Sequence, residues 1–322
     1  MHRRTVLIYN PYAGGLRRRS HALRQAVELL DAQGVTVDSI ATTGPGHAGE
    51  IARQEVDRGA DLILVAGGDG TINEVVNGMA FSEVPLGVLP AGTANVLACE
   101  LGIGKSMERA AKALAHAVPE RVALGSISNG GKDTPRYFLL MAGVGLDADI
   151  VYHLSARVKE AFGKVAYWIG GFSKLGSRFP EFTVEADGRE FRASFALLSR
   201  VRNYGGDLEI APTISLLDDE FEMVLFKGES SFGFLKYMLA VVAHQQQSMR
   251  GITILRTRQA SFSAFAGGPE PIHVQVDGEY VGSVPARVEI APNALTLLVP
   301  PSFRARRPAR VEDAAWTTSP TR

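Results

Sequence analysis

The sequence predicts an α/β chain of two domains, in which a parallel α/β domain precedes a domain rich in β-strands. Its 322 residues amount to about twice a typical domain of about 150 residues. Up to about residue 120, apolar runs alternate with helical patterns over short links, as in a parallel sheet with crossover helices. Beyond that point strand-like runs dominate, which indicates a mainly antiparallel second half.

The first domain is expected to span residues 1–122. One of its strands, at 61–67, carries an unbroken apolar run from Leu62 to Ala66, as expected of a strand that is buried on both faces of a sheet. The predicted strands cover residues 5–9, 35–41, 61–67 and 86–89. Capping residues and apolar spacing place the helices at about 20–34, 47–58, 71–79, 93–101 and 106–116.

The second domain is expected to span residues 123–294. Its strand-like runs lie at 137–142, 191–199, 221–226 and 272–276, and a last one follows at 295–299. Two helical inserts are predicted near 155–175 and 231–244. Residues 304–322 are rich in Arg, Pro, Ser and Thr, which predicts a disordered tail.

Composition and charge exclude several classes of protein. The 34 basic residues balance 34 acidic residues, so no global field recruits nucleic acid. The single cysteine, Cys99, cannot form an internal disulfide, which indicates a reducing, cytoplasmic setting. A membrane span needs about 20 apolar residues and a signal peptide an apolar stretch of about 7–15. We expect neither in this chain.

A glycine-rich loop follows the third predicted strand. Gly67, Gly68 and Gly70 surround Asp69, and a helix is predicted directly after them. Glycines let the backbone approach a ligand closely, and the free N–H groups at a helix start favour phosphate oxygens. Asp69 fits such a site if Mg²⁺ or ordered water lies between its carboxylate and the phosphates. The alternative is an ordinary turn in which Asp69 caps its helix.

Three more loops end predicted parallel strands at the same edge of the sheet. They carry Asn10 after the first strand, Thr42 and Thr43 after the second, and Thr93 after the fourth. Because open α/β sheets bind ligands at the carboxyl ends of their strands, these loops predict a nucleotide cleft. Thr93 would either donate its hydroxyl to a phosphate or cap its helix.

These segments resemble the catalytic domain of the diacylglycerol kinase family, which includes bacterial lipid kinases, sphingosine kinases and ceramide kinases. The matching motifs are Asn10-Pro11 with Gly14, GGDGTINE at 67–74, PAGTAN at 90–95, NYGG at 203–206, Ala211-Pro212, Asp218-Asp219 and DGE at 277–279. The resemblance covers about residues 4–300. It implies an NAD kinase- and phosphofructokinase-like nucleotide-binding domain and a C-terminal β-sandwich-like domain, with the active site between them. A strand near 295–303 is expected to return to the first domain.

The resemblance also implies an ATP site and a catalytic pair. The expected ATP contacts are Asn10, Thr42, Gly67, Gly68, Asp69, Gly70, Thr71, Asn73 and Thr93, with Glu74 organising the loop. Asp277 would accept the proton of the substrate hydroxyl as a general base, and Glu279 would orient the site. An Asp-Gly pair between two strands is also a common hairpin turn, so the assignment of Asp277 depends on the family resemblance.

Bacterial members of the family carry a structural Mg²⁺. The resemblance assigns it to the carboxylate of Asp218 and to the carbonyls of Ser215 and Glu220. Asp219 stands where a glycine normally follows, and an ordinary charged hairpin is the alternative.

Two departures concern the catalytic metal. Bacterial diacylglycerol kinases usually have Asp at the positions of Val96 and Ala123. Their absence would leave the binding of a catalytic Mg²⁺ to Asp69, to the nucleotide phosphates and to Asp147.

Two segments are candidates for contact with a lipid surface. Residues 152–179 interleave aromatic and basic side chains, which suits a lipid-facing lip, although a solvated helix with a buried face fits equally well. Residues 232–239 form an apolar stretch that either lies at a membrane interface or packs into a core, and core packing is favoured.

The leading hypothesis is an ATP- and Mg²⁺-dependent lipid kinase of phospholipid metabolism, cytoplasmic and transiently at the membrane surface. Its acceptor would be a diacylglycerol-like or sphingoid-like hydroxyl. One alternative is an NAD kinase, which shares a GGDGT-type loop. Another is a nucleotide-binding regulator without turnover, which Val96 and Ala123 motivate. The sequence does not fix the oligomeric state, and a homodimer is one state that it allows.

Overall fold

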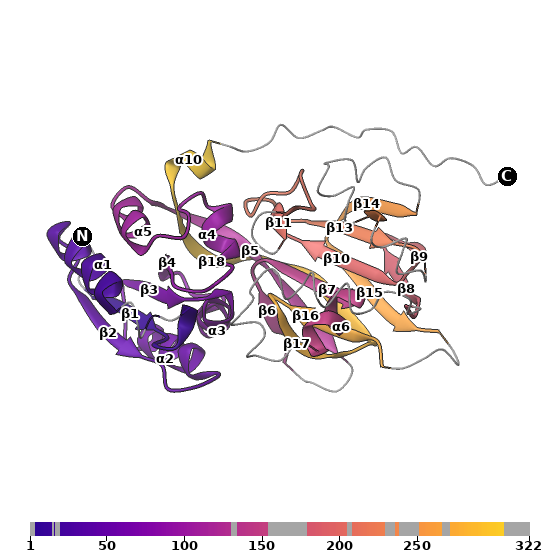
Figure 1. The fold of residues 1–322 in the computed structure, drawn as a ribbon, viewed down its shortest axis with the longest axis horizontal. Helices are drawn as coiled ribbons and strands as arrows, with labels where there is room; N and C mark the ends of the chain where they lie inside the picture. Colours follow the sequence, from indigo (N-terminus) through magenta and orange to yellow (C-terminus); the bar gives the residue numbers. More distant parts are fainter. Residues whose placement is uncertain are drawn as a thin grey trace.

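The computed structural model describes most of the chain as two lobes. It describes residues 4–14, 16, 20–129, 134–153, 179–204, 208–228, 236–237, 251–265 and 271–305. Figure 1 shows the α/β lobe on the left and the β-rich lobe on the right, with β5 (Val118–Asn129) and β18 (Ala286–Val299) at their junction. One apolar core fills the α/β lobe and reaches into the second lobe, and another lies within the β-rich lobe.

The α/β lobe is built on a parallel sheet with the strand order β2-β1-β3-β4. Its elements are β1 (Thr5–Tyr9), α1 (Ser20–Ala32), β2 (Val37–Ala41), α2 (His47–Asp57), β3 (Leu62–Gly67), α3 (Asp69–Met79), β4 (Pro85–Pro90), α4 (Val96–Glu100) and α5 (Met107–Leu114). The register places Tyr9 beside Ala41 and Ala66, and Ala66 beside Leu89. The carboxyl ends of the four strands therefore meet at one edge of the sheet.

The helix predicted from residue 93 begins later, so this predicted boundary is wrong. Asn95 precedes α4 with a φ of 51°, outside the helical region. Its side-chain amide binds both the N–H and the carbonyl of Gly92, at 2.8 Å each. These two bonds close residues 92–95 into a compact loop, and the helix starts only at Val96.

Strand β18 joins the two lobes. Its last part pairs in parallel with β4, where Thr296 lies beside Pro85, and its first part pairs antiparallel with β15 (Gln259–Ala264). The sheet of ten strands then continues through β15 to β8 (Phe182–Ala186) and β9 (Arg189–Ala193). Residues near the end of the chain thus extend a sheet that the first strands begin.

A second, antiparallel sheet has the order β14-β13-β10-β7-β16-β17. Its strands are β7 (Met141–Gly145), β10 (Phe195–Ser199), β13 (Phe221–Phe226), β14 (Ile252–Thr257), β16 (His273–Val276) and β17 (Glu279–Ser283). The side chains of both sheets share one core, in which Phe138 of β6 (Arg136–Phe138) stacks on Phe221 at 5.8 Å between ring centroids. The predicted fold class, an α/β domain followed by a β-sandwich-like domain, is confirmed. The domain boundaries remain predictions.

Short elements complete the described fold. They are α6 (Leu146–His153), β11 (Asn203–Tyr204), β12 (Leu208–Glu209) and α10 (Pro301–Arg304). The run predicted as one strand at 137–142 is divided between β6 and β7. The backbone N–H groups of Leu139, Leu140 and Met141 donate there to a carboxylate of the second lobe, and Leu139 and Leu140 lie outside both strands. The run at 191–199 is likewise divided between β9 and β10.

Several predicted segments lie outside the described residues. These are the insert at 155–175, most of the apolar stretch at 232–239, the rest of the insert at 231–244, and the tail beyond residue 305. Within that stretch, Tyr237 is fully buried and its ring stacks on Phe226 at 6.1 Å. This part of the stretch therefore packs into a core.

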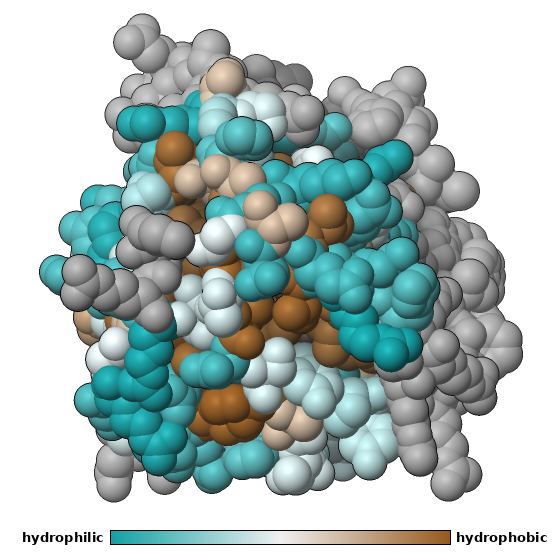
Figure 2. Space-filling model, turned by 90° about the vertical axis from the view of Figure 1, so that its left-hand side faces the viewer, coloured by the Kyte–Doolittle hydropathy of each residue, from teal (hydrophilic) through white to brown (hydrophobic). Residues whose placement is uncertain are grey.

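The outer end of the α/β lobe carries both polar and apolar surface. Figure 2 looks onto this end and shows brown apolar residues near the middle of the face, framed by teal hydrophilic residues. In the part of the chain that the structure describes, every helix is too short or too polar to cross a membrane.

Candidate active site

Two glycine-containing loops touch each other at the carboxyl edge of the parallel sheet. Strand β3 ends at Gly67, and Gly68 precedes α3 with an extended backbone. A side chain at Gly92, in the loop after β4, would place its Cβ 2.5 Å from Gly68 Cα. A side chain at position 92 would force the loops apart, so the two loops present one continuous backbone surface.

Asp69 ties the two loops together. Its carboxylate accepts the N–H of Val96 at 3.1 Å and the N–H of Leu97 at 3.3 Å. Desolvation raises the pKa of Asp69, and these hydrogen bonds oppose the rise. Asp69 therefore caps α4, and not its own helix as one interpretation of the sequence had it. Its contact with a metal or a phosphate stays a prediction.

The other residues expected to contact nucleotide phosphates lie along the same edge. Asn10 Nδ2 donates to Thr71 Oγ1 at 3.1 Å, which holds the end of β1 against the first turn of α3. The side chain of Thr42 is buried at the end of β2, whereas Thr43 contacts His47 Nδ1 through its hydroxyl at 3.0 Å. Thr43 therefore binds at the start of α2, and the contact of Thr42 with a nucleotide stays a prediction.

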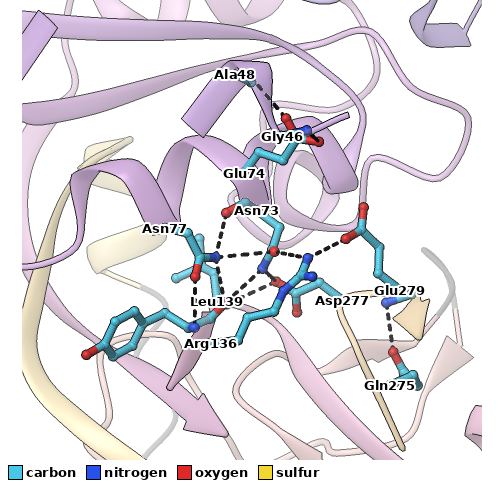
Figure 3. A network of polar contacts seen from close by, with 12 residues as sticks. Gly46, Ala48, Asn73, Glu74, Asn77, Arg136, Leu139, Gln275, Asp277 and Glu279 are labelled. Carbon is cyan, nitrogen blue, oxygen red and sulfur yellow. Dashed lines mark hydrogen bonds and ion pairs between the residues drawn. The ribbon is translucent and has the colours of Figure 1, made fainter. Parts of the chain in front are cut away.

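The remaining positions of this set differ in what they do locally. Thr93 is exposed at the surface of the second glycine-containing loop. Glu74 accepts the N–H of Gly46 at 2.8 Å and the N–H of Ala48 at 3.1 Å, so its carboxylate caps the start of α2. Figure 3 shows this cap at the upper end of the polar network. The binding of nucleotide by these residues stays a prediction.

Asp277 lies in the turn between β16 and β17 and faces the α/β lobe. The turn has left-handed backbone at Asp277 (φ 48°) and at Gly278 (φ 84°). Asp277 Oδ2 accepts a hydrogen bond from Asn73 Nδ2, on α3, at 2.9 Å. Figure 3 shows Asn73 and Asp277 pointing toward each other across the junction of the lobes. The glycine-rich segment and the DGE segment, 204 residues apart, are therefore in direct contact.

Three backbone groups complete the surroundings of the Asp277 carboxylate. Oδ1 accepts the N–H of Leu140 at 3.0 Å and the N–H of Met141 at 2.9 Å, and Oδ2 accepts the N–H of Leu139 at 3.0 Å. Desolvation raises the pKa of Asp277 to about 6, and the hydrogen bonds limit this rise. A carboxyl with this pKa is mostly ionised at neutral pH and can take up a proton.

Glu279 and Arg136 lie beside this contact. Their side chains form an ion pair, and Arg136 Nη2 also donates to Asn73 Oδ1 at 3.0 Å. A Cβ at Gly70 would come within 2.8 Å of Glu279 Oε1, so Glu279 lies against the glycine-rich loop. A pocket of about 460 Å³ is lined by Asn73, Arg136 and Glu279 together with the start of α2 and with Asn77.

A buried chain of polar groups supports the turn from behind. Gln275 Oε1 accepts the N–H of Gly278 at 2.8 Å, and Gln275 Nε2 donates to Asp147 Oδ2. Asp147 Oδ1 in turn accepts the hydroxyl of Tyr204. Asp147 is thus engaged with Gln275 and Tyr204, and its binding of a catalytic metal stays a prediction.

Two residues of this site escaped the sequence analysis. Gln275 gave no clear signal, because it stands at a polar position of the alternating strand His-Val-Gln-Val, and only the structure shows that its side chain is buried. Arg136 gave no signal in the sequence, because it directly precedes a predicted strand. Only the tertiary fold brings it to Asn73 and Glu279.

The residues that the resemblance assigns to a structural Mg²⁺ lie beside the guanidinium of Arg256, and their binding of a metal stays a prediction. Asp218 Oδ2 lies 3.2 Å from Arg256 Nη1, and the Ser215 carbonyl accepts the N–H of Asp218 at 2.9 Å. Glu220 also faces Arg256, at 3.7 Å. Among the residues that the structure describes, no three side chains of His, Cys, Asp or Glu are grouped to hold a metal ion.

The positions that lack the expected acids lie inside the protein. Val96 and Ala123 are both buried in the structure. Of the carboxylates expected at a catalytic metal, Asp69 alone lies in the glycine-rich loop, and each of its oxygens already accepts a backbone N–H.

Comparison with known proteins places this geometry in a family. A family profile described as "Diacylglycerol kinase catalytic domain" matches residues 4–127, and one described as "YegS C-terminal NAD kinase beta sandwich-like domain" matches residues 141–299. A diacylglycerol kinase of Bacillus subtilis is 32% identical over 289 residues, which cover 88% of this chain and 92% of that protein. The chain belongs to the diacylglycerol kinase family.

Further relatives agree with this assignment. A diacylglycerol kinase of Staphylococcus aureus is 29% identical over 294 residues, which cover 89% of each chain. A crystal structure of a diacylglycerol kinase from Bacillus anthracis shares the fold, with a TM-score of 0.74 at 22% identity over 94% of this chain and 98% of that one. The family resemblance that the sequence suggested is confirmed, and the protein is a lipid kinase of the diacylglycerol kinase family.

Proposed function

We propose that this protein transfers the γ-phosphate of ATP to a hydroxyl group of a diacylglycerol-like or sphingoid-like lipid. The observation that carries the proposal is the 2.9 Å hydrogen bond between Asn73, in the helix that follows the glycine-rich loop, and Asp277, in the turn of the second lobe. A phosphate held by the loop and a hydroxyl held beside Asp277 would meet there. Phosphoryl transfer depends chiefly on such positioning.

The nucleotide would lie along the carboxyl edge of the parallel sheet. The continuous backbone surface of the loops at 67–70 and 91–93 offers close approach, and the free N–H groups at the start of α3 favour phosphate oxygens. Asn10, Thr42 and Thr93 end neighbouring strands at this edge and would contact the nucleotide from the side. A Mg²⁺ bound with ATP would neutralise phosphate charge, with Asp69 as the nearest carboxylate of the loop.

Asp277 would act as the general base. Its carboxylate is held by three backbone N–H groups and one side chain, so its position is fixed before substrate arrives. The substrate hydroxyl would donate its proton to Oδ2 as its oxygen attacks the γ-phosphorus, and ADP would leave. Among the described residues that donate to Asp277, Asn73 alone does so through its side chain, so it is the group that can rotate to admit the hydroxyl.

Arg136 would contact the transferred phosphoryl group. Its guanidinium lines the pocket beside Asn73, is partly exposed, and balances its charge against Glu279. An incoming phosphate can compete for such a group, because guanidinium binds phosphate and carboxylate in the same way. With Val96 and Ala123 in place of acids, this arginine would supply positive charge that a more extensive metal network gives elsewhere in the family.

A lipid acceptor requires contact with a membrane surface. Tyr280 directly follows Glu279, and its exposed ring lies 4.8 Å from the exposed ring of Tyr152 on α6. Aromatic rings with a polar tip favour the interface of a bilayer. These two tyrosines support a peripheral, transient contact beside the catalytic turn by a cytoplasmic protein. The lipid-facing lip predicted at 152–179 lies almost wholly outside the described residues.

A lipid panel tests the proposal. The purified protein is incubated with γ-labelled ATP, Mg²⁺ and vesicles that contain diacylglycerol, ceramide, a sphingoid base or no acceptor, and with NAD in a separate reaction. We expect labelled lipid from at least one acceptor and no labelled NAD. Labelled NAD alone would indicate the NAD kinase alternative. ATP binding without transfer to any lipid would indicate a regulator without turnover, and either result would refute the proposal.

A further inference from the structure

The loop between β12 and β13 is closed by hydrogen bonds among its own residues. The N–H of Ser215 donates to Asp218 Oδ2 at 3.1 Å, and the N–H of Asp218 donates to the Ser215 carbonyl at 2.9 Å. The Ser215 hydroxyl accepts the N–H of Leu217 at 3.3 Å. The Ser215 carbonyl and the Asp218 carboxylate, two of the three expected ligands of a structural Mg²⁺, therefore already bind within the loop.

Arg256 brings a positive charge to this loop from β14, where it lies opposite Glu222 of β13. Its Nη1 lies 3.2 Å from Asp218 Oδ2 and 3.7 Å from Glu220 Oε2. Its Nη2 donates to the carbonyl and to the hydroxyl oxygen of Thr213. One guanidinium thus gathers two carboxylates and a carbonyl, which are the oxygen ligands that a hard divalent cation prefers.

Arg200 holds the same loop from inside the protein. Its side chain is fully buried, Nη1 donates to the Asp218 carbonyl at 3.1 Å, and Nη2 donates to the Leu216 carbonyl at 2.9 Å. Burial lowers the pKa of Arg200 to about 10, while the carboxylates of Asp219 and Asp218 act to raise it. The guanidinium therefore keeps its charge at neutral pH.

We propose that Arg256 and Arg200 take the place of the divalent cation for which the family reserves this loop, so that the loop binds no Mg²⁺. A cation at Asp218 would lie close to the guanidinium of Arg256, and like charges at that distance repel each other. A guanidinium carries five donors in a fixed fork, so two arginines can satisfy several oxygens at defined angles. Their covalent attachment also makes the arrangement independent of the ion concentration.

Arg200 also connects this loop to the turn that carries Asp277. The backbone N–H of Arg200 donates to the Leu140 carbonyl at 2.8 Å, and the N–H of Leu140 donates to Asp277 Oδ1 at 3.0 Å. The strand end that carries Arg200 therefore supports a peptide that binds Asp277. Arginine side chains maintain this support whether or not free Mg²⁺ is present.

Binding of Mn²⁺, a spectroscopic substitute for Mg²⁺, tests the proposal without any catalytic readout. The nucleotide-free protein, an Asp218→Asn variant and a Glu190→Gln variant are titrated with Mn²⁺, and the free ion is measured by electron paramagnetic resonance. Glu190 is an exposed carboxylate on β9 and serves as the matched control. We expect Asp218→Asn and Glu190→Gln to change the number of bound Mn²⁺ ions equally, or to leave it as in the wild type. The loss of one bound Mn²⁺ in Asp218→Asn alone would overturn the proposal.

Removal of the guanidinium gives the complementary test. Arg256→Ala removes the guanidinium that both the Asp218 and the Glu220 carboxylates face. We expect this variant to melt several degrees below the wild type in EDTA and to recover in part with Mg²⁺, whereas the wild type melts at the same temperature in both. If Arg256→Ala does not fold, Arg256→Lys is measured instead, and we expect it to melt below the wild type because it lacks the fork. A wild type stabilised by Mg²⁺, an Arg256→Ala variant indifferent to Mg²⁺, or an Arg256→Lys variant as stable as the wild type would contradict the proposal.

Discussion

Replacing Asn73 with alanine should move the acid limb of the pH–rate profile to higher pH. Asn73 Nδ2 donates to Asp277 Oδ2 at 2.9 Å and is one of the groups that lower the pKa of this carboxyl, which stands at about 6. A hydrogen bond to a charged group contributes about 1.5–3 kcal/mol, and one pKa unit corresponds to about 1.4 kcal/mol. Loss of this bond should therefore raise the pKa by roughly 1–2 units.

The sign of the effect follows from the role of the base. A general base works when it is ionised, so the rate of the wild type should rise with pH through about 6. In Asn73→Ala a smaller fraction of Asp277 is ionised at any given pH near neutrality, and the midpoint should lie at roughly 7–8. The assay measures kcat/KM for the lipid at saturating ATP, across about pH 5 to 9, because this ratio reports the pKa of Asp277 before the lipid hydroxyl displaces Asn73. Saturating ATP keeps weaker nucleotide binding out of the comparison.

Asn77→Ala is the matched control. Asn77 lies one turn further along α3 and binds the backbone of Tyr137 with both its donor and its acceptor, without contact to Asp277. This substitution should loosen the same helix and leave the midpoint unchanged. An Asn73→Ala profile with a lower plateau but the same midpoint, or an equal shift in both variants, would refute the reasoning.

Three further substitutions separate structure from catalysis. Glu74→Gln leaves one of the two N–H groups at the start of α2 without its carboxylate acceptor. The free energy of unfolding should fall by about 1 kcal/mol and the melting temperature by about 2–4 °C. An unchanged melting temperature would contradict the capping role of Glu74. Gln275→Ala removes the acceptor of the Gly278 N–H and so loosens the turn that carries Asp277. We expect kcat to fall roughly 10- to 100-fold while the affinity for ATP stays the same. A change in ATP affinity without a change in kcat would contradict this role of Gln275. Arg136→Gln removes the charge in the pocket and should lower kcat by about 10²-fold or more, whereas full activity would exclude a contact with the phosphoryl group.

Local patterns were sufficient to predict the α/β half of the fold. The uninterrupted apolar run that became β3, and the glycines that follow it, placed the end of the strand at Gly67 correctly, because a buried parallel strand and its turn have a distinct local composition. Strand boundaries in the second half were less accurate. The N–H groups near Leu139 leave the strand ladder only because Asp277 accepts them, and that partner is more than a hundred residues away in the sequence.

The sequence predicted only those residues of the candidate site that belong to a recognisable motif. Asp277 and Asn73 could be named in advance, but their contact could not, since it depends on how the two lobes pack. The capping of α4 by Asp69 was not predicted either, because Asp69 accepts the N–H of Val96 only after the two loops have come together in the fold. The contact of Arg256 with Asp218 was not predicted, because a basic residue in a strand gives no sign that its side chain will form an ion pair with that carboxylate.

The most direct test of the proposed mechanism is the rate of phosphoryl transfer by Asp277→Asn. This variant keeps the size of the side chain but cannot accept the substrate proton, so transfer from γ-labelled ATP to the acceptor lipid should fall by about 10²- to 10⁴-fold. Affinity for ATP, measured by titration calorimetry, should stay the same, and the melting temperature should show that the protein is folded. Transfer at the wild-type rate by folded Asp277→Asn would contradict the central role of this carboxylate.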